Sequence, residues 1–126
     1  MKIPNDLLQD ITIFHKNEDG TYNRYNVVAS VRNTAYLNRN RTGVSSVDSA
    51  LIRVFDIYGF KNGNWKCSKG DVIVNQLVGI DVDKAPLTKM REMFGKDNVY
   101  EVSSVAIFDY KRAEIKEINH VKIGGR

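Results

Sequence analysis

The sequence has few of the side chains that build metal and redox sites. It contains one cysteine, Cys67, and two histidines, His15 and His120. A single thiol excludes an internal disulfide and a thiolate metal cluster within one chain. Neither histidine is near Cys67 in the sequence, so we expect a buried, inert cysteine. We interpret His15 as a solvated residue beside a turn and place His120 in a strand. A zinc site shared by the two is the lesser alternative, and we predict no metal and no cofactor.

Long apolar runs are absent too. No stretch approaches the roughly 20 apolar residues that are needed to cross a bilayer. The first residues, Met1-Lys2-Ile3-Pro4-Asn5-Asp6, lack the positively charged and then apolar plan of a signal peptide. We therefore expect a protein that is made in a cytoplasm and has no membrane partner.

The motifs of common catalytic sites are missing as well. There is no Gly-x-Ser-x-Gly elbow for a nucleophile and no Gly-rich loop ending in Gly-Lys-Ser/Thr for a phosphate. Lys69-Gly70-Asp71 is better explained as a turn that leads into a strand. Asp81 and Asp83 alone offer too few oxygens for calcium, which takes about six to eight. We predict that the protein is not an enzyme and has no catalytic residues.

The sequence does have the composition of an ordinary globular domain. Of its 126 residues, 42% are hydrophobic and 27% are charged, as in most globular proteins. This length suits one modest core, so we predict a single domain over residues 1–126. The formal net charge is +4, a mild excess that fits either a nearby polyanion or plain solubility.

Alternating apolar residues predict about six short strands. The first two form a hairpin across the turn at 17–20, where Gly20 accepts a positive φ without steric cost. In the second strand, alternation puts Tyr25, Val27, Ala29 and Val31 on one face. The predicted strands cover residues 10–16, 22–31, 49–57, 71–78, 99–110 and 115–123.

One helix is predicted, over about residues 83–94. Asp83 suits its N-cap, Leu87, Met90 and Phe94 form one apolar stripe, and Gly95 suits the position after its end. Many short strands with turn signals favour a mainly β fold. We predict a small antiparallel β-barrel or sandwich in which this helix covers one open end or face.

A long loop over about residues 33–48 is the best functional candidate. From Arg32 to Ser46 the sequence has three arginines and no acidic residue. Arg32, Arg39 and Arg41, together with Tyr36, suit contacts with phosphates, because guanidinium groups bind phosphate bidentately. The plainer interpretation is a solvated loop that happens to be basic. One copy would bind DNA weakly, whereas a ring of copies would sum the contacts.

Three stretches, taken in order, resemble the small head-to-tail connector proteins of tailed bacteriophages, which include head-tail joining, minor capsid and stopper-like proteins. The first is Asp10-Ile11-Thr12-Ile13-Phe14-His15-Lys16 with Tyr22-Asn23-Arg24-Tyr25. The second is Gly63-Asn64-Trp65-Lys66-Cys67-Ser68-Lys69-Gly70-Asp71-Val72-Ile73-Val74, a Gly-x-Trp, polar, Gly-Asp and apolar-strand pattern. The third is His120-Val121-Lys122-Ile123-Gly124-Gly125-Arg126. Each motif is structural and unspecific alone, and their joint order carries the likeness.

The resemblance implies a structural virion protein of the neck, a stopper- or adaptor-like barrel that forms a homo-oligomeric ring. Its expected partners are a portal or adaptor protein above, a tail terminator or tail tube protein below, and packaged double-stranded DNA, which it contacts non-specifically and helps retain. The basic loop would lie near the channel. Residues 36–46 are more basic and less apolar than in a self-packing plug, so plugging, DNA contact and neighbour contact all stay open. The tail of Lys122, Ile123, Gly124, Gly125 and Arg126 is expected to be flexible or to contact a neighbouring subunit.

Two other functions fit the same pattern. A tail terminator or another neck protein has a similar size. An OB-like nucleic-acid-binding domain would instead use aromatic side chains on one sheet face to stack on bases. Seven rings are candidates for such stacking, although core packing is the expected use of most: Tyr22, Tyr25, Phe55, Tyr58, Tyr100, Phe108 and Tyr110.

Overall fold

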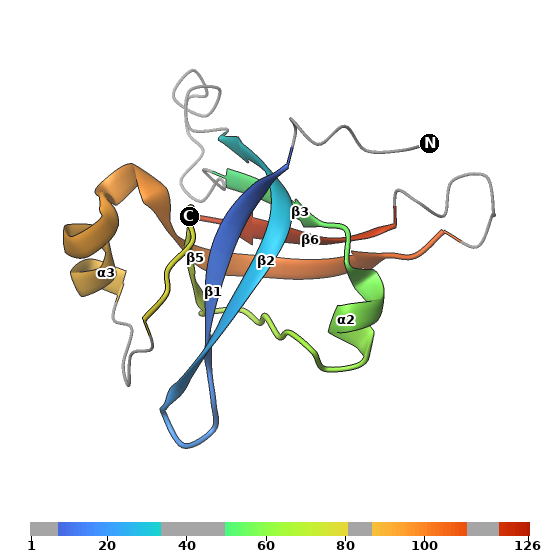
Figure 1. The fold of residues 1–126 in the computed structure, drawn as a ribbon, viewed down its shortest axis with the longest axis horizontal. Helices are drawn as coiled ribbons and strands as arrows, with labels where there is room; N and C mark the ends of the chain where they lie inside the picture. Colours follow the sequence, from blue (N-terminus) through green and yellow to red (C-terminus); the bar gives the residue numbers. More distant parts are fainter. Residues whose placement is uncertain (1–7, 34–49, 81–86, 111–118) are drawn as a thin grey trace, which may run out of the picture.

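The computed structural model describes residues 8–33, 50–80, 87–110 and 119–126. Within these ranges the chain forms a closed antiparallel barrel with the strand order β1-β2-β3-β6-β5-β4 (Figure 1). The strands are β1 (Gln9–Lys16), β2 (Tyr22–Asn33), β3 (Ala50–Val54), β4 (Val72–Val74), β5 (Val99–Phe108) and β6 (His120–Gly125). Two short helices, α2 (Ile57–Lys61) and α3 (Leu87–Phe94), and a 3-10 turn, η2 (Lys96–Asn98), lie outside the barrel wall. The predicted mainly β fold with a small six-stranded barrel is confirmed.

The first hairpin has the register that the sequence pattern predicts. β1 and β2 pair from Gln9 opposite Ala29 to Lys16 opposite Tyr22. Gly20 takes a φ of 90° and donates its N–H to Asn17 at 3.0 Å. Beyond Ala29, β2 pairs with β3 instead of β1. The 12-residue strand therefore curves from one side of the barrel to the next.

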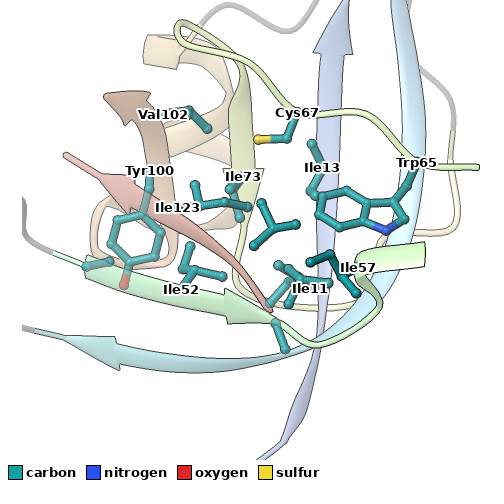
Figure 2. Packing of buried hydrophobic residues seen from close by; sticks show 14 residues of the cluster. Ile11, Ile13, Ile52, Ile57, Trp65, Cys67, Ile73, Tyr100, Val102 and Ile123 are labelled. Atoms are coloured by element: carbon teal, nitrogen blue, oxygen red, sulfur yellow. The ribbon is translucent and has the colours of Figure 1, made fainter. Parts of the chain in front are cut away.

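The barrel interior holds the larger of two apolar clusters. Its buried members are Ile11, Ile13, Ala29, Ala50, Ile52, Val54, Ile57, Trp65, Cys67, Ile73, Tyr100, Val102, Val121 and Ile123. Figure 2 shows Tyr100 and Trp65 toward opposite ends of this cluster. Trp65 is 2% exposed, and its indole N–H donates to the carbonyl of Asp56 at 3.0 Å. The segment after β3 therefore contributes its own side chains to the interior.

The second apolar cluster lies on the outside of the barrel, beneath α3. It consists of Phe14, Val72, Val74, Val78, Met90 and Val99. Met90 is buried, and Leu87 and Phe94 pack against the same cluster. The predicted helical stripe is thus confirmed, as is the helix end, because Gly95 has a φ of 100°. The predicted helix start, with Asp83, lies outside the described residues.

Helix α2 replaces the end of a predicted strand. The strand expected over 49–57 ends at Val54, and Asp56 then caps a helix by accepting the N–H of Gly59 at 3.0 Å. A Cβ at Gly59 would lie 2.2 Å from the Asp56 carboxylate, so this cap requires glycine. The alternation of apolar residues does not reveal this contact between Asp56 and Gly59, so the pattern predicted a longer strand instead of the helix.

The remaining differences concern strand ends. The strand expected over 71–78 is limited to Val72–Val74. It ends there because the following segment turns over β1, where Thr12 Oγ1 donates to the carbonyl of Gln76 and accepts from the N–H of Val78. The last strand is His120–Gly125, whereas it was expected over 115–123. Residues 111–118, and the predicted loop apart from Asn33, lie outside the described residues.

Candidate interaction surface

The outer wall of the barrel has two halves. On β1, β4 and the start of β5, the outward apolar side chains are covered by α3 and by the segment that follows β4, residues 75–78. We call this half the covered face. The other half, the open face, comprises the outward side chains of β2, β3, β6 and the end of β5. They are Asn26, Val28, Ser30, Arg32, Leu51, Arg53, Phe55, Ser104, Ala106, Phe108, His120, Lys122 and Gly124.

An aromatic row crosses the open face. Phe108 and His120 are paired residues of β5 and β6, and their rings stack with centroids 5.0 Å apart and an interplanar angle of 16°. Phe55, directly after β3, lies 5.8 Å from His120 in a tilted arrangement. Phe108 is 37% exposed, and Val28, beside this row on β2, is 50% exposed. These apolar side chains lie outside both core clusters.

A shallow groove extends the aromatic row toward β2. It has a volume of about 440 Å³ and is lined by Leu8, Asn26, Val27, Val28, Phe55 and Asp56. Its lining is mostly apolar apart from Asn26 and Asp56. An apolar groove beside exposed rings is the kind of surface that protein partners bury.

A basic row lies next to the aromatic row. Arg53 on β3 and Lys122 on β6 are directly paired, so both side chains point outward from neighbouring strands. Arg32 pairs with Leu51 and is therefore the diagonal neighbour of Arg53. None of the outward side chains of the open face is an aspartate or glutamate. Acidic residues border it, with Asp10 opposite Val28, Glu101 near the start of β5 and Asp109 after β5.

The basic row is not neutralised within the described ranges. There, no ion pair or side-chain hydrogen bond uses Arg32, Arg53 or Lys122. Other cations do have such partners. Arg24 donates to the carbonyl of Val78 at 2.6 Å, and Lys61 contacts Asp109. The three cations of the basic row are thus available to an external anion.

The structure brings together only part of the residue set predicted from sequence. Arg32 is exposed at the end of β2, whereas Tyr36, Arg39 and Arg41 lie outside the described residues. Sequence reasoning missed Arg53, and it assigned Lys122 to a subunit-contact tail rather than to this row. Their alternation with buried neighbours marks them as outward-facing, but their pairing depends on strands nearly 70 residues apart in the sequence.

The predicted tail is part of the barrel wall. Lys122, Ile123, Gly124 and Gly125 belong to β6, which is hydrogen-bonded to β3 on one side and to β5 on the other. Ile123 is fully buried, and the backbone of Arg126 exchanges two hydrogen bonds with Glu101. The expectation of a flexible end was therefore wrong. Contact of Lys122 or Arg126 with a neighbouring subunit stays a prediction.

A second polar site ties the first hairpin to the turn before β4. Asp71 is 2% exposed, and its carboxylate accepts the backbone N–H groups of Lys16 at 3.1 Å and Ser68 at 2.8 Å. Its Oδ2 also lies 2.7 Å from Nδ1 of His15. His15 is only 17% exposed, so its interpretation as a solvated residue was wrong. The turn at Lys69-Gly70-Asp71 is confirmed, with a φ of 95° at Gly70.

Ser68, His15 and Asp71 do not have the geometry of a catalytic triad. Ser68 Oγ lies 3.4 Å from Nδ1 of His15, the same nitrogen that faces Asp71. In a triad the serine and the carboxylate meet opposite nitrogens of the imidazole, so that a proton can pass from one side. The neighbouring cleft, of about 410 Å³, is lined by Lys16 at the end of β1 and mainly by turn residues, among them Glu18 and Lys69. This cluster is best explained as a structural lock.

Cys67 behaves as the sequence predicts. It is 6% exposed in the barrel core, and burial together with the charge of Asp71 raises the pKa of its thiol. A raised pKa keeps the thiol neutral and unreactive. In the described part of the chain, no three His, Cys, Asp or Glu side chains gather into a metal-binding group. No helix there has the length and apolar character of a membrane span.

These features define the class of the molecule as a small closed antiparallel β-barrel with one covered and one open outer face. The chain belongs to the family of unknown function DUF6751, whose profile matches residues 7–126. No curated protein and no solved structure matches it significantly. The resemblance to phage connector proteins therefore stays a prediction.

Proposed function

We propose that the chain is a structural subunit of the phage head-to-tail interface, a stopper- or adaptor-like ring protein in the virion neck. It joins a portal or adaptor protein to a tail terminator or tail tube protein and helps to retain packaged DNA. The observation that carries the proposal is the aromatic row of the open face, with exposed Val28 beside it. The barrel does not need these side chains for its core.

The closure of the barrel supports ring assembly through this face. The six strands close on themselves, so no whole strand edge is left for another copy to extend. Faces and loops are therefore the expected contact surfaces. Aromatic residues and arginine are enriched in protein interfaces and dominate their binding energy. A head-to-tail contact between such faces closes into a ring when the rotation per subunit permits.

The test is incorporation of the full chain into particles. Phage that lacks the gene is supplied with wild-type protein, with the double variant Phe55→Ser and Phe108→Ser, or with Leu77→Ser. Leu77 is 59% exposed on the segment after β4, so it is a matched apolar control. We expect tailed, DNA-filled particles with wild type and with the control, and untailed or emptied heads with the double variant.

Localisation decides among neck positions. A micrograph of labelled particles should place the chain between portal and tail. A position at the top of the tail tube would favour a tail terminator. Absence of the chain from the neck, or full infectivity of the double variant, would refute the proposal.

An OB-like nucleic-acid-binding domain is the second candidate. It is favoured by one observation, the position of the aromatic row beside three cations that have no ion-pair partner among the described residues. Rings beside cations bind single-stranded nucleic acid by stacking on bases and neutralising phosphates. Tight binding of single-stranded DNA by the isolated monomer, lost in the same double variant, would favour this candidate over a ring subunit.

A further inference from the structure

We infer that the basic row of Arg32, Arg53 and Lys122 binds the phosphate backbone of double-stranded DNA. This inference rests on the proposed function, because it names the surface of the ring subunit that meets the packaged DNA. It moves the expected DNA contact onto the barrel wall. Arg32 is the one residue shared with the contact predicted from sequence.

The arrangement of the three cations fits a polyanion. Arg53 and Lys122 are directly paired, and neighbouring strands are about 4.8 Å apart. Arg32 is diagonal to Arg53 across the next strand pair, at about 7–8 Å between backbones. Within the described ranges, three positive charges thus lie close together without a carboxylate among the outward side chains of the open face. Such a cluster repels itself unless an external anion balances it.

The burial of the side chains also suits binding. Arg53 and Lys122 are half-buried, although both are outward-facing. Long cationic side chains with partial burial typically lay their aliphatic stems along the protein surface and keep the charged ends in water. Stems held in this way lose less conformational freedom when the charged ends bind a phosphate.

The neighbours of the basic row favour DNA over an acidic protein. Within the same rows of the open face lie Ser30, Ala106, Gly124 and Ser104, which have short side chains, and one larger apolar residue, Leu51. The core of a protein interface relies on apolar contact, and the aromatic row offers far more of it than the basic row does. No ring lies within the basic row to stack on bases. The shared chemistry is therefore phosphate contact with a duplex.

The experiment is a titration of the full chain with a short DNA duplex at about 50 and about 200 mM salt. Changes in the backbone NMR shifts report both the affinity and the residues that bind. Each neutralised phosphate adds about −0.9 to the slope of log affinity against log salt. Three contacts predict a loss of affinity of about 40-fold over this range. Shifts should centre on Arg32, Arg53 and Lys122 and on their strand neighbours.

Paired variants isolate the basic row. The double variant Arg53→Ala and Lys122→Ala should bind more weakly at low salt and lose only about 3- to 4-fold between the two salt concentrations, as expected for one contact. The control, Lys66→Ala with Lys89→Ala, removes two exposed lysines outside the open face and changes the net charge equally. It should keep the wild-type salt dependence. Equal behaviour of the two double variants, or no shifts at low salt, would overturn the inference.

Other ligands separate this inference from its rivals. Polyglutamate that competes as well as the duplex at equal charge would indicate a protein partner. Stronger binding of a single strand, with shifts centred on Phe55 and Phe108, would indicate base stacking. Either outcome overturns the duplex assignment, and neither affects the location of the chain in the neck. The failure of the inference is thus distinguishable from the failure of the proposed function.

Discussion

The two halves of the barrel's outer wall both carry outward apolar side chains, but these are buried on one half and partly exposed on the other. On the covered face, outward Phe14, Val72 and Val74 are buried, because α3 and the segment ending at Val78 lie over them. On the open face, outward Val28 and Phe108 stay partly exposed. The comparison teaches that an outward apolar residue is a core residue only where the chain supplies its own cover. Where no described segment covers it, the same residue type is a contact surface.

The largest expected effect lies under α3. Phe14 is fully buried although it points out of the barrel. Phe14→Ala should lower the free energy of unfolding by about 3–5 kcal/mol, because it leaves a cavity between the barrel and the helix. Urea unfolding followed by circular dichroism would measure it. A loss below about 1 kcal/mol would mean that α3 is not a firm part of the fold.

The polar lock beside the covered face should come next. Asp71→Ala removes the acceptor of two backbone N–H groups and the partner of His15. A hydrogen bond to a charged group contributes about 1.5–3 kcal/mol, and because these two are only partly buried we expect a loss of about 2–4 kcal/mol in total. Glu18→Ala, an exposed residue of the neighbouring turn, is the control and should leave unfolding unchanged. Similar midpoints for the two variants would contradict the lock.

A third test asks whether β6 is a packed strand of the barrel wall or a loose segment. A Cβ added at Gly125 would lie 2.9 Å from Cβ of Tyr100, and both residues are buried. Gly125→Ala should therefore cost about 1–3 kcal/mol through overpacking. Gly79→Ala is the control, because nothing lies within 4 Å of its added Cβ. If both variants unfold alike in urea, the end of the chain is not packed as a strand.

The smallest expected effect comes from making the same substitution on the covered face and on the open face. Val74→Thr and Val28→Thr make the same change on the covered and on the open face. The buried hydroxyl at Val74, which is fully buried, should cost about 1–3 kcal/mol. The half-exposed Val28 should change stability by no more than about 0.5 kcal/mol. Equal losses for the pair would show that the two faces do not differ in cover.

Much of the fold could be predicted from local sequence pattern. Alternation identified β1, β2 and β5, and the stripe of Leu87, Met90 and Phe94 identified α3. These signals depend on residues a few positions apart. Helix α2 was missed because its cap depends on the close fit of Gly59 against Asp56, which composition does not reveal.

The candidate surface was harder to predict, because it depends on strand register. Arg53 and Lys122 become neighbours only when β3 pairs with β6, and His15 meets Asp71 only when β1 lies beside the turn before β4. Of the aromatic residues expected mostly in the core, Tyr100 is buried, whereas Tyr58 and Tyr110 are exposed. Alternation gives the face of a side chain within its strand and not what covers that face.

The position of β6 also bears on the synthesis of the chain. On a ribosome, the β1–β2 hairpin is complete once Asn33 has left the exit tunnel. β3 lacks its second neighbour until His120–Gly125 emerges, because Ile52 and Ile123 belong to the same closing pair. Until then the nascent sheet is open, with unpaired backbone groups and interior side chains in water. The emergence of β6 thus turns an open, aggregation-prone sheet into a closed barrel, and loss of this strand would leave β3 and β5 with exposed edges.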